Sequence, residues 1–183
     1  MIQTRDVRHL SKDNNRRVIS TTAAKWQSLT DTLPEELLER SPRPGEWSAF
    51  ECLQHLLIVE RLLIPVRVRH ILEGRPELIP YDPDAPAEPL AERTPRELVA
   101  AFAAERRANE ALLAGLTPGD LERTSCHPEF GTVTLSMLVN LWAAHDLQHT
   151  VQAELALMQA FIPGIGPWRY EFADHDVAVG ARS

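Results

Sequence analysis

The distribution of proline is the feature that most constrains how this chain folds. Six of the fourteen prolines fall between Pro76 and Pro95, with acidic residues among them. Proline lacks the amide proton that helix interiors and central strands need, so this segment forms neither. A long irregular connection inside a compact domain is usually a functional loop or a crossover between elements. We therefore expect helices on both sides, joined by this crossover.

Two helices are expected before the crossover. The first covers about residues 15–29, with a short helical piece at 34–40. The second covers 48–74, because Ser48 and the glutamate three residues later form a capping box and a glycine and a proline end the pattern. Pro65 lies inside this second helix, where its missing amide proton predicts a kink.

Two further helices are expected after the crossover. A second capping box, with a proline at the first helical position, opens a helix over 94–115. A loop is expected over 116–133, followed by a fourth helix over about 134–160 and an irregular tail over 161–183. The alternation that marks strands is nearly absent. The sequence therefore predicts an all-α four-helix bundle with one long crossover between helices 2 and 3.

Composition sets the class of protein. A chain of 183 residues, 44% of them hydrophobic, is expected to be a single domain, 1–183, with a bundle core at about 15–160. The net charge of −7 argues against nucleic acid as a partner, because phosphate binding needs a basic face. We expect no membrane span, and the start lacks the apolar segment of a secretory signal, so a cytoplasmic location is expected. Cys52 and Cys126 are then free thiols.

Three of the seven histidines form the candidate site. His145 and His149 are four residues apart, so they share one helix face at the spacing that a single metal needs from two imidazoles. Both fall on an apolar stripe of the 134–160 helix, and His55 falls on such a stripe of the 48–74 helix. Buried unpaired imidazoles cost about 1–3 kcal/mol each, and a shared divalent metal removes that cost. A bundle without metal is the structural alternative.

The expected depths of these histidines in the bundle agree. If helices 2 and 4 are antiparallel, His55 and His149 lie about 10 and 16 Å from the same end of the bundle, at 1.5 Å per residue. This offset is about one helical turn. His70 lies fifteen residues beyond His55, about 22 Å along a straight helix, and cannot reach the same site.

Other side chains near the histidines are given mainly structural interpretations. Cys52 reads as a small buried hydrophobe. Glu51 either completes the helix cap or holds His55 as an outer carboxylate. Gln152, on the stripe of the fourth helix, is a candidate to orient a histidine or a ligand. Trp47 is expected to be a packing residue, with pocket lining as the alternative.

Two segments resemble a known family. Residues 44–56, PGEWSAFECLQHL, place a histidine seven positions after Trp-Ser, and residues 145–152, HDLQHTVQ, supply a His-x-x-x-His-x-x-Gln motif. Together with the crossover, they resemble the DinB/YfiT-like superfamily of metal-binding four-helix bundles. The resemblance implies an up-down-down-up bundle, often a homodimer, with Zn²⁺ or Ni²⁺ bound by His55, His145 and His149. The resemblance also implies a possible enzyme activity. Characterised members of this superfamily include enzymes that use a low-molecular-weight thiol such as bacillithiol, mycothiol or glutathione, and some hydrolases.

Three neutral imidazoles leave a divalent metal with its charge uncompensated and a coordination position open, as in catalytic sites. The expected function is therefore metal-dependent activation of a low-molecular-weight thiol, or of water, for attack on a small electrophilic substrate. The alternative is a non-catalytic metal-binding, ligand-binding or stress-response bundle. Imidazole ligands suit zinc and nickel alike, so the sequence does not choose the metal.

Overall fold

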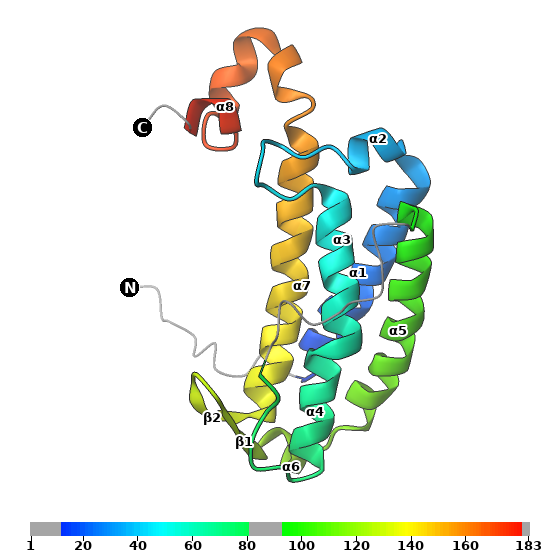
Figure 1. Cartoon of the computed structure of the whole chain (residues 1–183), viewed down its shortest axis with the longest axis vertical. Helices are drawn as coiled ribbons and strands as arrows, with labels where there is room; N and C mark the ends of the chain where they lie inside the picture. The colour runs from blue at the N-terminus through cyan, green and yellow to red at the C-terminus, as the bar shows by residue number, and fades with distance from the viewer. Residues whose placement is uncertain (1–11, 81–92, 181–183) are drawn as a thin grey trace.

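A four-helix bundle dominates the computed structural model, which describes residues 12–80 and 93–180. Its helices are α1 (Lys12–Thr32), α3 (Ala49–Leu62) continued by α4 (Ile64–Leu72), α5 (Pro95–Gly115) and α7 (Leu135–Met158). In Figure 1, α1 and α7 run in one direction, whereas α3–α4 and α5 run in the other. This arrangement confirms the predicted all-α bundle with up-down-down-up topology. The crossover segment 81–92 lies outside the described residues.

The core lies where α1 and α3–α4 each pack against both α5 and α7. Large apolar side chains fill it, among them Trp26, Phe102 and Trp142, all fully buried. Two apolar clusters divide the length of the bundle, one around Trp26 and the other around Trp142. Burial of such side chains contributes about 1.5–3 kcal/mol each for the aliphatic and phenylalanine members.

The second bundle helix is broken in the middle. Leu63 leaves the helical region, with φ −121° and ψ −77°, between the end of α3 and the start of α4. Pro65 sits in the first turn of α4, where its missing amide proton is tolerated. The kink predicted at Pro65 is therefore present as a break two residues earlier. Leu62, the last residue of α3, is 56% exposed.

A β-hairpin corrects the expectation of a plain loop at 116–133. After the single turn of α6 (Pro118–Leu121), β1 (Thr124–His127) pairs antiparallel with β2 (Gly131–Thr134). Threonine and valine favour extended backbone, and Gly131 takes the positive φ of 68° that the turn requires. The hairpin also holds the start of the crossover, since the Leu78 amide donates to the Cys126 carbonyl at 2.9 Å.

Short helical turns flank the bundle. The expected piece at 34–40 is present as α2 (Glu35–Leu38). The tail expected to be irregular contains the 3₁₀ helices η3 (Ile162–Gly164) and η4 (Gly166–Phe172), then α8 (Val177–Gly180). Within the described residues, no helix has the combination of length and apolar character that crossing a bilayer requires.

Candidate metal centre

Two helix caps set the positions of the histidines. Ser48 caps α3, accepting from the Glu51 amide at 3.2 Å, while the Glu51 carboxylate accepts from the Ser48 amide at 2.7 Å. Thr134 caps α7 by accepting from the Met137 amide at 3.1 Å. These caps fix where each helix begins, and the antiparallel packing of α3 and α7 then brings their histidines to the same level.

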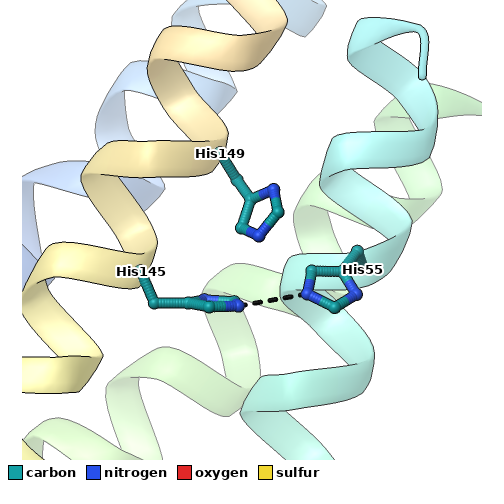
Figure 2. A group of neighbouring side chains, drawn as sticks. All are labelled: His55, His145 and His149. Atoms are coloured by element: carbon teal, nitrogen blue, oxygen red, sulfur yellow. Dashed lines mark hydrogen bonds between the residues drawn. The ribbon is translucent and has the colours of Figure 1, made fainter. Parts of the chain in front are cut away.

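The three predicted histidines meet between α3 and α7 (Figure 2). One ring nitrogen from each of His55, His145 and His149 lies within 4.8 Å of the others. The Nε2 atoms of His55 and His145 are 3.1 Å apart. His149 is 7% exposed, and the other two side chains are half-buried. The structure thus brings together all three candidates, in the arrangement that a single ion needs.

Burial keeps these imidazoles neutral. It lowers the pKa of His145 to about 3, helped by the neighbouring charges of His149, His55 and Arg106. It lowers the pKa of His55 to about 4, helped by His149. The pKa of His149 is also lowered by burial, against a hydrogen bond to Gln152 that raises it. Near pH 7 each ring therefore has a free lone pair, which is the form that binds a metal.

A hydrogen bond selects the tautomer of His149. Its Nδ1 lies 2.9 Å from Oε1 of Gln152, an oxygen that only accepts, so Nδ1 carries the proton and Nε2 carries the lone pair. Gln152 therefore orients a histidine, one of the two roles predicted for it. His145 Nδ1 is buried and has no partner among the described residues.

The donor set fits a divalent transition metal. Two Nε2 lone pairs 3.1 Å apart repel each other unless a proton or a cation lies between them. One proton can bridge one pair of rings but not three. A metal with imidazole ligands satisfies all three rings at once, and such ligands suit zinc, nickel, copper and iron.

Trp47 lies against the cluster. Its ring centroid is 5.0 Å from that of His55 and 5.7 Å from that of His149, nearly parallel to the latter at 25°. The indole is 38% exposed, so it separates the imidazoles from solvent on one side. Trp47 is thus more than the packing residue expected from the sequence.

The other candidate residues have structural roles or lie outside the cluster. Cys52 is fully buried, and burial raises its pKa to about 12, so it is an inert core thiol as predicted. Glu51 serves the Ser48 cap, the structural one of its two predicted roles. Trp168 lies on η4 and is 62% exposed, so it is not part of the core. His70 lies on α4, outside the cluster.

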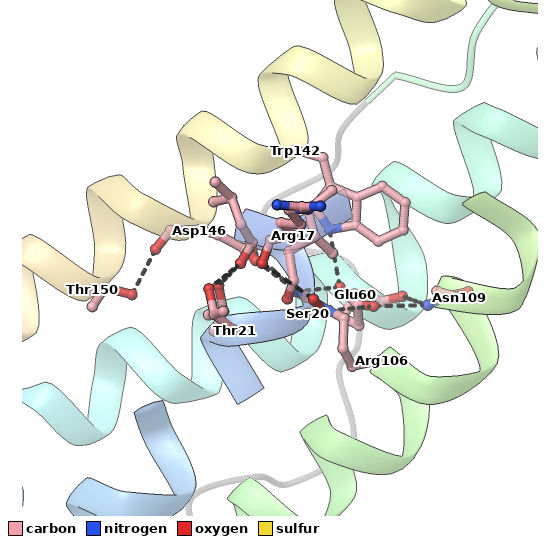
Figure 3. A network of polar contacts seen from close by, with 12 residues as sticks. Arg17, Ser20, Thr21, Glu60, Arg106, Asn109, Trp142, Asp146 and Thr150 are labelled. Atoms are coloured by element: carbon pink, nitrogen blue, oxygen red, sulfur yellow. Dashed lines mark hydrogen bonds and ion pairs between the residues drawn. The ribbon is translucent and has the colours of Figure 1, made fainter. Parts of the chain in front are cut away.

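A buried ion network next to the histidines escaped the sequence reasoning (Figure 3). Arg106 of α5 donates through Nε and Nη2 to both Glu60 oxygens, at 3.0 and 2.9 Å. Its Nη2 also donates to Asp146 Oδ1 at 3.0 Å, and its Nη1 contacts Oδ2. Asn109 and Trp142 donate to the Glu60 carboxylate at 3.0 and 3.1 Å. The side chains of the arginine and both carboxylates are only 1% exposed.

This network fixes the level of the histidine-bearing helices. Asp146 lies between His145 and His149 on α7, and Glu60 lies on α3 with His55. Arg106 joins both carboxylates and also donates to the Ile19 carbonyl of α1, so all four bundle helices meet at one guanidinium. Burial raises the pKa of Glu60 and of Asp146, although Arg106 opposes this shift. A slip of α7 against α3 would therefore separate buried charges.

A sequence signal for the network exists. Asp146 falls on a stripe of α7 that is buried throughout: Leu135, Val139, Trp142, Asp146, Thr150, Ala153 and Leu157. The stripe predicted to face inward is also mostly buried, and only His145 and Gln152 on it are half-buried. A carboxylate within an apolar stripe indicates a buried partner, because an unpaired charge is costly there.

A pocket of about 550 Å³ lies beside the histidine cluster. Trp47 and Gln152 form part of its wall, next to His149, which both residues contact. The tail also lines it, through Asp174 and His175. Glu46 adds a second carboxylate to the lining. The size of the pocket is in the usual range of small-molecule sites.

Fold and site together define a class: an up-down-down-up four-helix bundle with three convergent histidines. Comparisons with known proteins give the family. Residues 19–153 match the DinB superfamily, and the chain belongs to it.

Individual relatives agree with this assignment. A protein of Oceanobacillus iheyensis, provisionally named a metal-dependent hydrolase, is 30% identical over 119 residues, which is 64% of this chain and 69% of that one. A protein of Bacillus mycoides with the same provisional name is 29% identical over 140 residues, covering 69% of this chain and 80% of its own. Among solved structures, YfiT from Bacillus subtilis matches with a TM-score of 0.72 at 20% identity, covering 85% of this chain and 93% of that one. It is described as a probable metal-dependent hydrolase with an unusual four-helix bundle topology, and at this identity it supports the fold.

Proposed function

We propose that this protein is a metal-dependent enzyme in which His55, His145 and His149 bind one divalent transition metal, zinc or nickel. The observation that carries the proposal is the convergence of three neutral imidazoles within 4.8 Å. The provisional names of its relatives add support for a metal-dependent hydrolase. When bound, a metal with three neutral ligands supplies the Lewis acidity that makes water or a thiol nucleophilic near neutral pH.

The residues around the cluster have separate tasks in this proposal. Gln152 holds His149 in the tautomer that exposes its Nε2 lone pair. Trp47 excludes water from one side of the imidazoles, which strengthens electrostatic interactions there. The Arg106 network keeps α3 and α7 at the same level, so the three ligand atoms stay convergent.

The pocket beside Trp47 is the proposed substrate site. Carboxylates of Glu46 and Asp174 line it together with amide groups, including that of Gln152. This lining favours a small polar electrophile that carries no negative charge.

Water and an external thiol are the two candidate nucleophiles. Cys52 cannot supply the thiol, because it is buried and its pKa is raised to about 12 by burial. A thiol must therefore come from a second small molecule. The relatives' provisional names favour water as the nucleophile. The family resemblance in the sequence supports a thiol as the other candidate.

Metal content is the first test. Protein purified without an affinity tag and reconstituted with zinc or nickel is expected to hold about one equivalent by elemental analysis. The His149→Ala variant is expected to lose it, whereas His70→Ala, a bundle histidine outside the cluster, should retain it. Less than about 0.1 equivalent in the reconstituted wild type would exclude the site.

Turnover is the second test. The metal-loaded protein is assayed on a panel of small neutral esters, amides and epoxides, with and without low-molecular-weight thiols. Product that requires the thiol identifies a transferase, and thiol-independent product identifies a hydrolase. Metal binding without any product would favour the non-catalytic alternative.

The homodimer implied by the resemblance stays a prediction. Light scattering on the purified protein checks it directly.

A further inference from the structure

A second pocket lies near the β-hairpin, away from the one beside Trp47. It encloses about 260 Å³ between α4, the hairpin and the start of α7. Its aliphatic lining residues are Leu78, Val133, Leu138 and Leu141. The volume equals the liquid share of roughly nine water molecules, so it suits a ligand with about as many non-hydrogen atoms. Neither the histidine cluster nor the proposed reaction uses this pocket.

A buried cation lines this apolar pocket. Arg67 of α4 is only 6% exposed. Its Nε and Nη2 both donate to one oxygen, the Ile79 carbonyl, at 3.2 and 3.0 Å. In the described part of the chain, no acceptor contacts its Nη1 and no carboxylate lies within ion-pair distance. A buried guanidinium paired only with a carbonyl is an energetically incomplete arrangement.

The surroundings of Arg67 favour an anion. Burial lowers the pKa of Arg67, and Glu129 in the exposed hairpin turn opposes this shift without reaching contact distance. His127 also lines the pocket. Its Nδ1 accepts from the Glu129 amide at 3.1 Å, so the neutral ring carries its proton on Nε2 as a further donor.

The mouth of the pocket is apolar and exposed. Phe130 is 75% exposed, Met137 58% and Leu141 50%, and all three line the pocket. A ligand with an apolar body would cover these side chains while its charged group reached Arg67.

We propose that this pocket binds a small monocarboxylate with an apolar body, its carboxylate on Arg67 and its body against the leucines and Phe130. Planar guanidinium groups hold carboxylates through paired, charge-assisted hydrogen bonds. The site is separate from the histidine cluster, because none of its three histidines lines this pocket. Binding therefore does not require the metal.

Methionine labelling provides a specific readout. The chain has three methionines, of which Met137 lines the pocket and Met158 ends α7. Hexanoate is titrated into metal-free protein carrying ¹³C-methyl methionine. We expect a saturable shift of the Met137 signal with a Kd below about 1 mM, while the Met158 signal stays in place. The neutral analogue 1-hexanol is expected to bind at least about tenfold more weakly.

Variants identify the anchor. Arg67→Met should weaken hexanoate binding about 10- to 100-fold, the loss expected for a charge-assisted hydrogen bond. Arg96→Met, which removes an exposed arginine of α5, should have no effect. Glu129→Gln should tighten binding, because it removes a competing negative charge. Val133→Phe fills the pocket and leaves Arg67 in place, so its loss of binding tests the location even if Arg67→Met folds poorly.

Three results would overturn the proposal. The first is equal binding of hexanoate and 1-hexanol, which would show an apolar cavity without anion recognition. The second is unchanged binding to a folded Arg67→Met variant. The third is a Met137 signal that responds to protein concentration but not to hexanoate, which would identify this face as an interface between two copies of the chain.

Discussion

Removing Arg106 should reveal how strongly the buried ion network stabilises the bundle. The Arg106→Met variant keeps a long side chain over the rings of Phe102 and Trp142, which lie 4.7 and 5.7 Å from the guanidinium. It removes the only cation that contacts Glu60 and Asp146 within the described residues. Both carboxylates are 1% exposed, so solvent cannot replace the lost partner.

The expected loss is large. Breaking a buried ion pair by removing one partner costs about 3–5 kcal/mol, and here one substitution strands two carboxylates. Domains of this kind are stable by only about 5–15 kcal/mol. With a urea m-value of about 2 kcal/mol per molar, a loss of 4 kcal/mol lowers the unfolding midpoint by about 2 M. Arg106→Lys keeps the charge but loses the planar fork, so it should fall between this variant and wild type.

Urea unfolding of metal-free protein, followed by circular dichroism, measures the effect. The matched control is Arg107→Met, an exposed arginine next along α5, which should change stability by less than about 0.5 kcal/mol. The loss should shrink as the pH falls from 8 to 5. Burial already raises the folded-state pKa of Glu60 and Asp146, and without Arg106 it should rise further, so their protonation at lower pH favours the folded state. A loss below about 1 kcal/mol at pH 8 would refute the reasoning.

Three further outcomes are expected at the histidine cluster. Gln152→Ala should weaken metal binding about 10- to 100-fold without removing a ligand, as measured by competition with a chelator. Trp47→Ala should leave one equivalent of metal bound but change kcat or KM, because it opens one side of the cluster to water; an unchanged kcat and KM would show that the indole only packs. In metal-free protein His145 alone should account for a loss of up to about 2 kcal/mol of stability between pH 7 and pH 5, because its folded-state pKa lies near 3, below its unfolded value, and protons then favour the unfolded chain. His55, whose folded-state pKa lies near 4, adds to this loss. Urea unfolding at the two pH values measures this loss, and the His145→Ala variant should lose less.

The helical order could be predicted because its signals are local. The capping boxes at Ser48 and Thr94 place the starts of α3 and α5 correctly, and both are present with their reciprocal hydrogen bonds. The topology follows from the long crossover, which lets two consecutive helices run in parallel. The hairpin was missed because its strands span only four residues each, too short for an alternation to stand out.

The candidate site could be predicted in its residues but not in its surroundings. His145 and His149 share a face by helical spacing alone, and the antiparallel partner brings His55 to them. That these residues hold a metal remains a prediction. The Trp47 contact depends on the path of a loop, and the Arg106 network depends on which helices are neighbours, and neither is encoded in local spacing.

The segment after α7 contributes to the pocket beside Trp47 but not to the histidine cluster. The family match ends at residue 153, whereas pocket residues such as Leu155, Asp174 and His175 lie beyond it. The histidines and the Arg106 network, all within 19–153, can therefore stay unchanged while the segment after α7 varies. Exchanging that segment between relatives would then change one side of the pocket while leaving the histidine cluster as it is.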